Sequence, residues 1–196
     1  GELEQDFATY LTAEAKNFAP SVDWSEQDLT ALTSDVTKRF DDWIRKHPHH
    51  FQGLMAYARI LEEENRTAEL ETTLIQMVEL YPQYAGADNA CLRVAALYQK
   101  QERFDLELSY LEQHATWNPN ALPVFQRLAI LYKQQENWES VYQACQAANA
   151  INPLDQETQL LLANACIQLN RDPEAVAAYQ AILALEPHNP AETHYQ

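Results

Sequence analysis

VELYP at residues 78–82 ends an apolar, helix-like run with a proline, and three later stretches do the same: ATWNP (115–119), NAINP (149–153) and LALEP (183–187). The prolines recur on a common period. The steps from Pro48 are 34, 37, 34 and 34 residues. A period of this size indicates one helical supersecondary unit that is stacked several times along the chain.

The composition agrees with a helical protein. The chain has 196 residues, of which 46% are hydrophobic and only three are glycine. This length is typical of one domain or one solenoid with an ample core. Glycine is too scarce for the hairpin turns of a β-protein, and Ala, Leu, Gln and Glu favour helices.

The chain is strongly acidic, with 29 acidic and 13 basic residues and a net charge of −16. Such a surface repels phosphate backbones and anionic lipid headgroups, so it argues against binding to nucleic acid or to a membrane surface. The simplest interpretation of the acidity is solubility. No apolar run is long enough for a transmembrane helix, and no signal peptide opens the chain.

Packing positions repeat within each unit when its final proline is numbered 32. Position 8 is always alanine, which allows two helices to approach closely. Position 7 holds Tyr57, Val94, Leu128 and Leu162, and position 8 holds Ala58, Ala95, Ala129 and Ala163. Position 11 holds Leu61, Tyr98, Tyr132 and Cys166, and position 24 holds Leu74, Leu111, Cys145 and Tyr179. Glu107 departs from this apolar pattern at position 20 and suggests an irregular second helix in its unit.

This register resembles that of the tetratricopeptide repeat over about residues 49–187. The resemblance implies an all-α fold, a right-handed superhelix (α-solenoid) of helix-turn-helix repeats, whose first helix we term the A helix and whose second we term the B helix. The expected parts are an N-terminal two-helix cap or degenerate repeat (1–48), repeats 1 to 4 (49–82, 83–119, 120–153 and 154–187) and the start of a closing helix (188–196). Repeat 2 has a longer loop before its first helix.

Local signals set the expected helix ends. The expected helices are 2–18, 26–46, 50–63, 67–80, 88–101, 104–117, 121–134, 138–150, 155–168 and 172–185. Asn120 and Asp155 are expected N-caps, and Pro123 is expected in a first helical turn. Ser25 and Asp28 are an expected capping box. Asn189 and Pro190 begin a further helix, and we favour a longer parent chain in which that helix continues.

No motif for catalysis or for a cofactor is present. The sequence lacks a phosphate-binding glycine loop, HExxH, GxSxG and CxxC, so we expect no enzyme activity and no cofactor. His47, His49 and His50 form the one histidine cluster, and loop histidines are a better interpretation than a metal site. Cys91, Cys145 and Cys166 are interpreted as buried apolar residues.

The resemblance places positions 2, 5, 6, 9, 12 and 13 of each A helix in a concave groove. The candidate groove residues are Met55, Arg59, Asn89, Leu92, Arg93, Lys100, Gln126, Arg127, Ile130, Lys133, Leu160 and Asn164. Arg59, Arg93 and Arg127 recur every 34 residues and would hold acidic or carboxylate groups of a partner. The alternative is that each arginine pairs with an acidic residue of a neighbouring helix.

The expected function is non-catalytic recognition of a peptide or protein partner in this groove. Two alternatives remain: the helical-repeat segment of a larger, possibly secreted enzyme, and a self-assembling scaffold. The carboxylate clamp of some family members is not supported, because only Arg127 matches it. The sequence does not identify the compartment, which is cytoplasmic, or periplasmic or secreted if a leader was removed.

Overall fold

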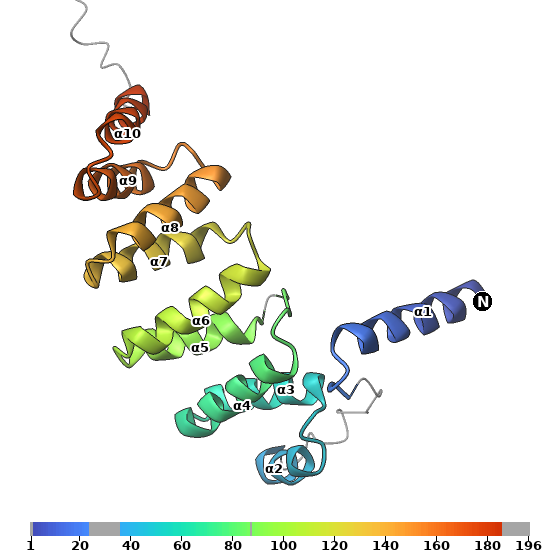
Figure 1. Ribbon diagram of the computed structural model, residues 1–196. Helices are drawn as coiled ribbons and strands as arrows, with labels where there is room; N and C mark the ends of the chain where they lie inside the picture. Colours follow the sequence, from blue (N-terminus) through green and yellow to red (C-terminus); the bar gives the residue numbers. More distant parts are fainter. Residues whose placement is uncertain (1, 24–35, 87, 186–196) are drawn as a thin grey trace, which may run out of the picture. The chain divides into compact units, whose positions relative to one another are not determined.

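The computed structural model describes residues 2–23, 36–86 and 88–185, and in this part of the chain all regular secondary structure is helical (Figure 1). The all-α fold class expected from the sequence is therefore confirmed. The helices are α1 (Glu2–Phe18), α2 (Val36–Lys46), α3 (Phe51–Glu63), α4 (Thr67–Leu80), α5 (Ala90–Lys100), α6 (Phe104–Trp117), α7 (Leu122–Gln134), α8 (Trp138–Ile151), α9 (Gln156–Gln168) and α10 (Asp172–Leu185).

These bounds lie within two residues of the expected ones for every helix except α2. The expected start of that helix and the Ser25–Asp28 capping box lie outside the described residues, as do Asn189 and Pro190. The A helices are α3, α5, α7 and α9, and the B helices are α4, α6, α8 and α10. The division into repeats remains a prediction.

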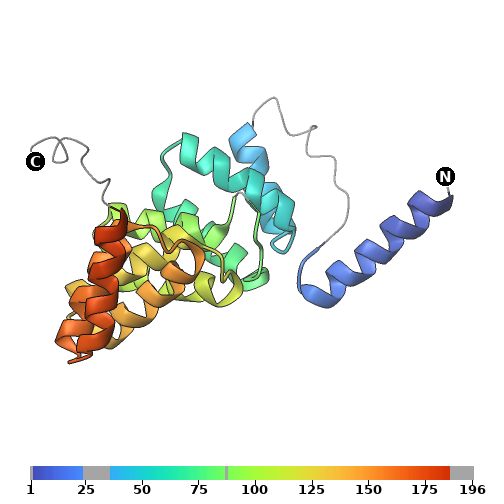
Figure 2. The ribbon, with the colours of Figure 1, turned by 90° about the horizontal axis from the view of Figure 1, so that it is seen from above.

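The chain divides between Tyr110 and Leu111 into two compact units, unit 1 and unit 2. In unit 1, α3 packs against α2 and α4, and α4 packs against α5. In unit 2, α8 packs against α7 and α9, and α9 packs against α10. Figures 1 and 2 show the helices of unit 2 stacked in layers, so consecutive helices in sequence are neighbours in space.

The core follows the predicted register. Ala58, Ala95, Ala129 and Ala163 are at most 3% exposed, so the small side chain at position 8 is buried in every repeat. Leucines beside them, such as Leu54 and Leu61, are fully buried. Burial of one such side chain stabilises the fold by roughly 1.5–3 kcal/mol. The alanines therefore mark the places where A and B helices approach most closely.

Each A–B turn contains one residue with a left-handed backbone at position 15. Asn65, Glu102, Glu136 and Asn170 have φ between 56° and 58°. In each turn the next residue donates its N–H to the carbonyl of position 11, as Asn137 does to Tyr132 at 3.0 Å. This bond is that of the Schellman motif, which satisfies carbonyls left free at a helix end. All four described turns therefore share one geometry.

The helix starts agree in part with the expected caps. Asp155 is the N-cap of α9, and its carboxylate accepts a hydrogen bond from the Thr158 N–H at 2.9 Å. The hydrogen bonds from the hydroxyl and the N–H of Thr158 lower the pKa of Asp155. Asn120 is not a cap: the N-cap of α7 is Ala121, which makes no side-chain bond, and Pro123 lies in the first turn as expected. The helix α7 begins one residue later than predicted, at Leu122, and Pro123 is its second residue.

Glu107 does not disturb its helix. It is 2% exposed, and its N–H donates to the carbonyl of Arg103 at 3.0 Å, as in a regular helix. The helix α6 has 14 residues, as do α4, α8 and α10. The expected irregularity is therefore wrong: a buried carboxylate is accommodated without a change in backbone register.

The helix α1 exposes large apolar side chains. Phe7, Tyr10, Leu11 and Phe18 are between 49% and 64% exposed. Just after the helix, Ala19 and Val22 are buried in the core cluster of unit 1. Among the described helices none is long and apolar enough to cross a membrane.

Candidate partner-binding surfaces

The arginines of unit 1 are paired with acidic residues. Arg59 on α3 forms an ion pair with Asp88, and Nη2 of Arg93 on α5 lies 2.9 Å from Oε2 of Glu62 on α3. Arg59 is mostly exposed, and its bond to Asp88 raises its pKa. Exposed pairs of this kind typically contribute little to stability. The pairs favour the alternative interpretation of the arginine stripe for these two residues.

Arg127 in unit 2 is half-buried and has an interaction within the protein, so it is not a free cation. The proposed role of the three arginines in partner binding therefore requires that a partner displace a carboxylate or bind beside it. That role remains a prediction.

Two polar candidates serve the fold itself. Asn89 is 5% exposed and is the N-cap of α5: its Oδ1 accepts from the Leu92 N–H at 3.1 Å, and its Nδ2 donates to the carbonyl of Tyr84. Gln126 is half-buried, and its Nε2 donates to Oδ2 of Asp155 at 3.0 Å. Both side chains hold helix ends in place, which leaves them little freedom to meet a partner.

Several apolar candidates remain in solvent. Leu92 on α5 is 36% exposed, and in unit 2 Ile130 on α7 and Leu160 on α9 are 39% and 48% exposed. Ile167, further along α9, is 47% exposed. Met55 is partly buried against the core of unit 1, and Asn164 is half-buried. Leu92, Ile130 and Leu160 thus lie in solvent at A-helix positions that the sequence assigned to partner contact.

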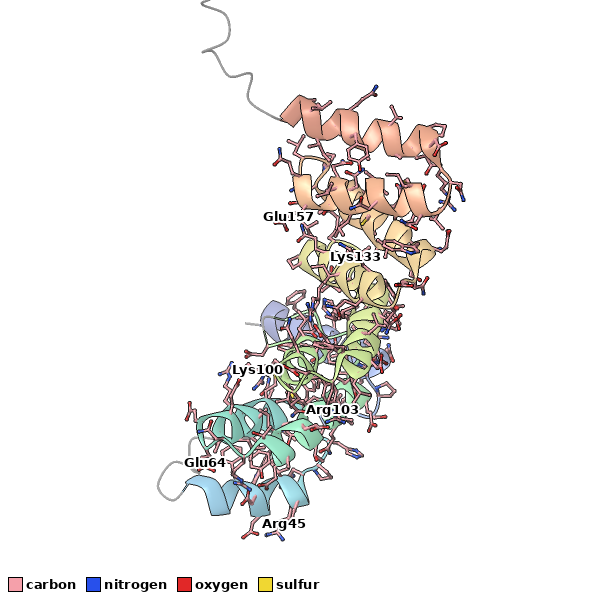
Figure 3. The ribbon with its side chains drawn as sticks, turned by 90° about the vertical axis from the view of Figure 1, so that its left-hand side faces the viewer. Arg45, Glu64, Lys100, Arg103, Lys133 and Glu157 are labelled. Carbon is pink, nitrogen blue, oxygen red and sulfur yellow. The ribbon has the colours of Figure 1, made fainter. Side chains whose placement is uncertain are left out.

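Lys100 and Lys133 are exposed near the ends of α5 and α7, at positions 13 and 12. Figure 3 labels both and shows Lys100 projecting away from the ribbon of unit 1. Neither lysine forms an ion pair within the residues that the structure covers. Each is available to an anionic group on a partner.

A cavity of about 350 Å³ opens in unit 1 between α3, α4 and α5. Its wall combines aliphatic side chains with two of the candidate cations. The lining residues are Leu61, Glu62, Asn65, Thr67, Leu70, Leu74, Arg93, Ala96, Leu97, Lys100 and Gln101. Ligand pockets commonly have volumes of roughly 300–1,000 Å³ and combine apolar walls with a few polar groups.

A smaller cavity of about 230 Å³ in unit 2 lies among residues of α6, α7 and α8. One wall holds Tyr132, whose hydroxyl donates to Oε1 of Glu112 at 2.5 Å. Burial and this bond raise the pKa of Tyr132. The carboxylate of Glu112 is already paired with Tyr132, so this cavity is the weaker candidate.

Sequence reasoning missed a second set of arginines, at position 16 of the A–B turns. Arg66, Arg103 and Arg171 lie over the rings of Tyr57, Tyr98 and Tyr142, with the guanidinium carbon 6.0, 4.6 and 4.2 Å from the ring centre. Arg103 also pairs with Glu71 of the preceding repeat at 3.2 Å. Their spacings of 37 and 68 residues, close to one and two repeat lengths, were the available signal, but spacing alone does not show which aromatic ring each arginine meets.

The histidine cluster has structural roles. His50 is 1% exposed and caps α3, with its Nδ1 accepting from the Gly53 N–H at 2.9 Å. The ring of His47 stacks on Trp43 at 4.5 Å. No group of three or more potential metal ligands occurs among the residues covered by the structure. Cys91, Cys145 and Cys166 are free and buried, as expected.

No family model matches the chain, and no curated protein matches it. Solved structures do. MamA is 13% identical, covers 83% of this chain and 96% of its own, and has a TM-score of 0.56. A MamA fragment from Desulfovibrio magneticus RS-1 is 19% identical over 78% of this chain and 84% of its own, with a TM-score of 0.50.

YrrB, described as a TPR protein with an unusual peptide-binding site, is 16% identical over 76% of this chain and 75% of its own, with a TM-score of 0.56. At such low identity the likeness concerns the fold alone. It is a likeness to proteins built from stacked helical pairs.

Proposed function

Because the chain has the tetratricopeptide-repeat fold, an α-solenoid, we propose that it is a non-catalytic module that binds a peptide or protein partner on its A helices. The observation that carries the proposal is the exposure of aliphatic side chains at A-helix positions. Leu92 and Leu160 both occupy position 5, and Ile130 occupies position 9. In α5, α7 and α9 the alanine at position 8 is buried, so these exposed residues lie on another side of the helix from the packed alanine.

Exposed aliphatic groups gain roughly 25 cal/mol for each Å² that a partner removes from water. In unit 2, Ile130 and Leu160 would form the apolar floor, while Lys133 would orient polar or acidic groups. A few buried anchors of this type usually dominate the binding energy of an interface. In unit 1, Met55 and Leu92 would have the same role beside Arg93 and Lys100.

The charge of the chain shapes the choice of partner. A net charge of −16 disfavours nucleic acid and anionic membranes, because phosphate groups would be repelled at long range. A protein or peptide partner with local acidic groups is compatible only where it meets the exposed cations of the A helices. YrrB is a TPR protein with a peptide-binding site, which supports a peptide ligand as the first class to test.

The test is selection of binders from a displayed library of random peptides, followed by calorimetric titration of the selected peptides. Ile130→Glu and Leu160→Glu should each weaken binding by at least about five-fold, since each places a charge where an apolar anchor sits. Leu154→Glu is the matched control: Leu154 is 67% exposed but lies in the loop before α9. Equal affinity of all three variants and the parent protein would refute binding on the A helices.

A second candidate function is self-assembly, and the exposed side of α10 favours it. Val176, Tyr179 and Leu183 on α10 are 55%, 39% and 63% exposed. Tyr179 occupies position 24, where Leu74, Leu111 and Cys145 are at most 5% exposed. In α4 and α8 this side faces the next A helix, whereas on α10 a second copy of the chain would cover it.

Sedimentation velocity over a wide range of protein concentrations tests self-assembly. The parent protein should form larger species as its concentration rises, and Leu183→Glu should reduce them. Leu106→Glu, a change at a 36% exposed leucine of α6, is the control. A parent protein that stays monomeric at every concentration would exclude this candidate.

A further inference from the structure

Arg93 lines the unit 1 cavity and has a hydrogen-bond donor that the fold leaves unfilled. Nη2 of Arg93 donates to Oε2 of Glu62 at 2.9 Å and to the carbonyl of Ala58 at 3.4 Å. Its Nη1 is buried and has no hydrogen-bond partner within the described part of the chain. A buried donor without a partner is costly, and a guanidinium matches a carboxylate best through two parallel bonds. Arg93 therefore makes only half of the interaction that its shape allows.

The side chain of Glu62 is much more exposed to solvent than that of Arg93. Its side chain is 60% exposed, whereas that of Arg93 is 18% exposed. If Glu62 swings into solvent, it regains its hydration at little cost, because an exposed ion pair is worth little. Arg93 would stay in the wall of the cavity. The pair can therefore open without a change in the packing of α3 against α4.

We propose that this cavity receives the carboxylate of an acidic side chain on a partner peptide, which displaces Glu62 and binds Arg93 through both terminal nitrogens. This contact would require the guanidinium to turn so that Nη1 faces the cavity. The inference rests on the proposed peptide-binding function and names the chemistry that one part of that surface recognises. Glu62 then competes with the partner's carboxylate for Arg93 and lowers the affinity for weak ligands.

The rest of the wall defines the neighbours of that carboxylate. Leu70, Leu74 and Leu97 provide an apolar lining, which fits an aliphatic residue next to the acidic one. Lys100, at the rim, adds a positive charge. Glu63 and Glu64, exposed at the end of α3, add negative charge nearby and disfavour a doubly charged phosphate. The preferred ligand is a short peptide with one carboxylate beside an aliphatic side chain.

The experiment uses two blocked pentapeptides, Ac-Ala-Leu-Glu-Leu-Ala-amide and its counterpart with Gln in place of Glu. Each is titrated into the isotope-labelled chain and followed by NMR at the Arg93 side-chain N–H groups and the Leu97 and Lys100 amides. The Glu peptide should shift these signals, and the Gln peptide should bind at least about 10-fold more weakly, because bonds to charged groups are the stronger ones.

Variants at the pair should act in opposite directions. Arg93→Gln should reduce affinity for the Glu peptide by about 10-fold, and Arg93→Lys should also weaken it, since lysine cannot form the two-bond contact. Glu62→Gln should increase affinity, because the competing carboxylate is gone. Arg45→Gln is the matched control: Arg45 on α2 is exposed, pairs with Asp42 and does not line the cavity.

Two results would overturn the inference: equal binding of the Glu and Gln peptides, or a Glu62→Gln variant that binds no more tightly than the parent. The Glu62→Gln test remains decisive even if the Arg93→Gln variant fails to fold. Library peptides that bind through Ile130 and Leu160 without any preference for acidic residues would refute this inference and leave the proposed function intact.

Discussion

The indole ring of Trp43 lies against the backbone of Gly53, where it fills the space that a side chain would otherwise take. Trp43 is on α2 and Gly53 is in the first turn of α3. A Cβ added to Gly53 would overlap ring atoms of Trp43 and would lie 3.0 Å from Nδ1 of His50. The contact joins α2 to the first A helix, α3.

Gly53→Ala should therefore destabilise the protein. Alanine normally improves a helix by about 1 kcal/mol over glycine. Here overpacking against the rigid indole should cost about 2 kcal/mol net. Urea denaturation monitored by circular dichroism measures the change. Gln52→Ala, an exposed position in the same helical turn, is the control and should be nearly neutral. A Gly53→Ala protein as stable as the parent would contradict the contact.

Glu136→Gly should stabilise the protein by about 0.5–1 kcal/mol. Glu136 has φ of 56°, a conformation that a side chain disfavours and glycine adopts freely. The Schellman bond from Asn137 to Tyr132 uses backbone atoms and is kept. Thermal melting of Glu136→Gly and Glu136→Ala distinguishes relief of backbone strain from loss of the glutamate side chain as the cause. Alanine keeps the Cβ, so it should give no gain, and equal gains in both variants would show that backbone strain is not the reason.

His114 should make stability depend on pH. It is 4% exposed, and burial lowers its pKa. Below about pH 6.5 the unfolded chain binds a proton at this histidine that the folded chain does not bind, so stability falls as the pH falls through this value. His114→Leu should flatten this part of the profile of unfolding free energy against pH. At about pH 8 His114 is neutral in both the folded and the unfolded chain, so the difference in stability between the variant and the parent at this pH measures the effect of packing alone. An unchanged slope would refute this role.

The three cysteines should be unreactive in the folded protein. Each is at most 2% exposed, and burial raises the pKa of Cys91 to about 11 and that of Cys145 to about 12, and also raises that of Cys166. A thiol reagent at about pH 8 should modify none of them until concentrated guanidinium chloride is added, since the thiolate is the reactive form. Rapid modification of one thiol in the native protein would show that its helix opens readily.

Much of the fold was readable from the chain because the signals are local and repeated. The period of the prolines, the alanines at position 8 and the apolar positions around them predicted the helices to within two residues for nine of the ten. Burial of Ala58 and its equivalents was predicted for the same reason. Asn120 is not the cap because α7 begins one residue later than expected, and local preferences did not distinguish Asn120 from Ala121 as the residue before the helix.

The candidate sites were predicted as positions on the A helices, but not as interactions. A repeat register shows which residues share a side of a helix. It does not show that Arg59 meets Asp88 or that Arg93 meets Glu62, residues 29 and 31 apart in the chain. Nor does it show that Asn89 would be used as a cap.

By itself the sequence determined the helical class, the buried alanines of the A helices and the positions at which Leu92, Ile130 and Leu160 are exposed, because each depends on spacing within one or two turns. Only the tertiary structure decided the partners of the arginines, the cavity between α3, α4 and α5 and the place of Gly53 under Trp43. These depend on how separate helices approach, and a shift of one side chain's width between two helices would create or remove each of them.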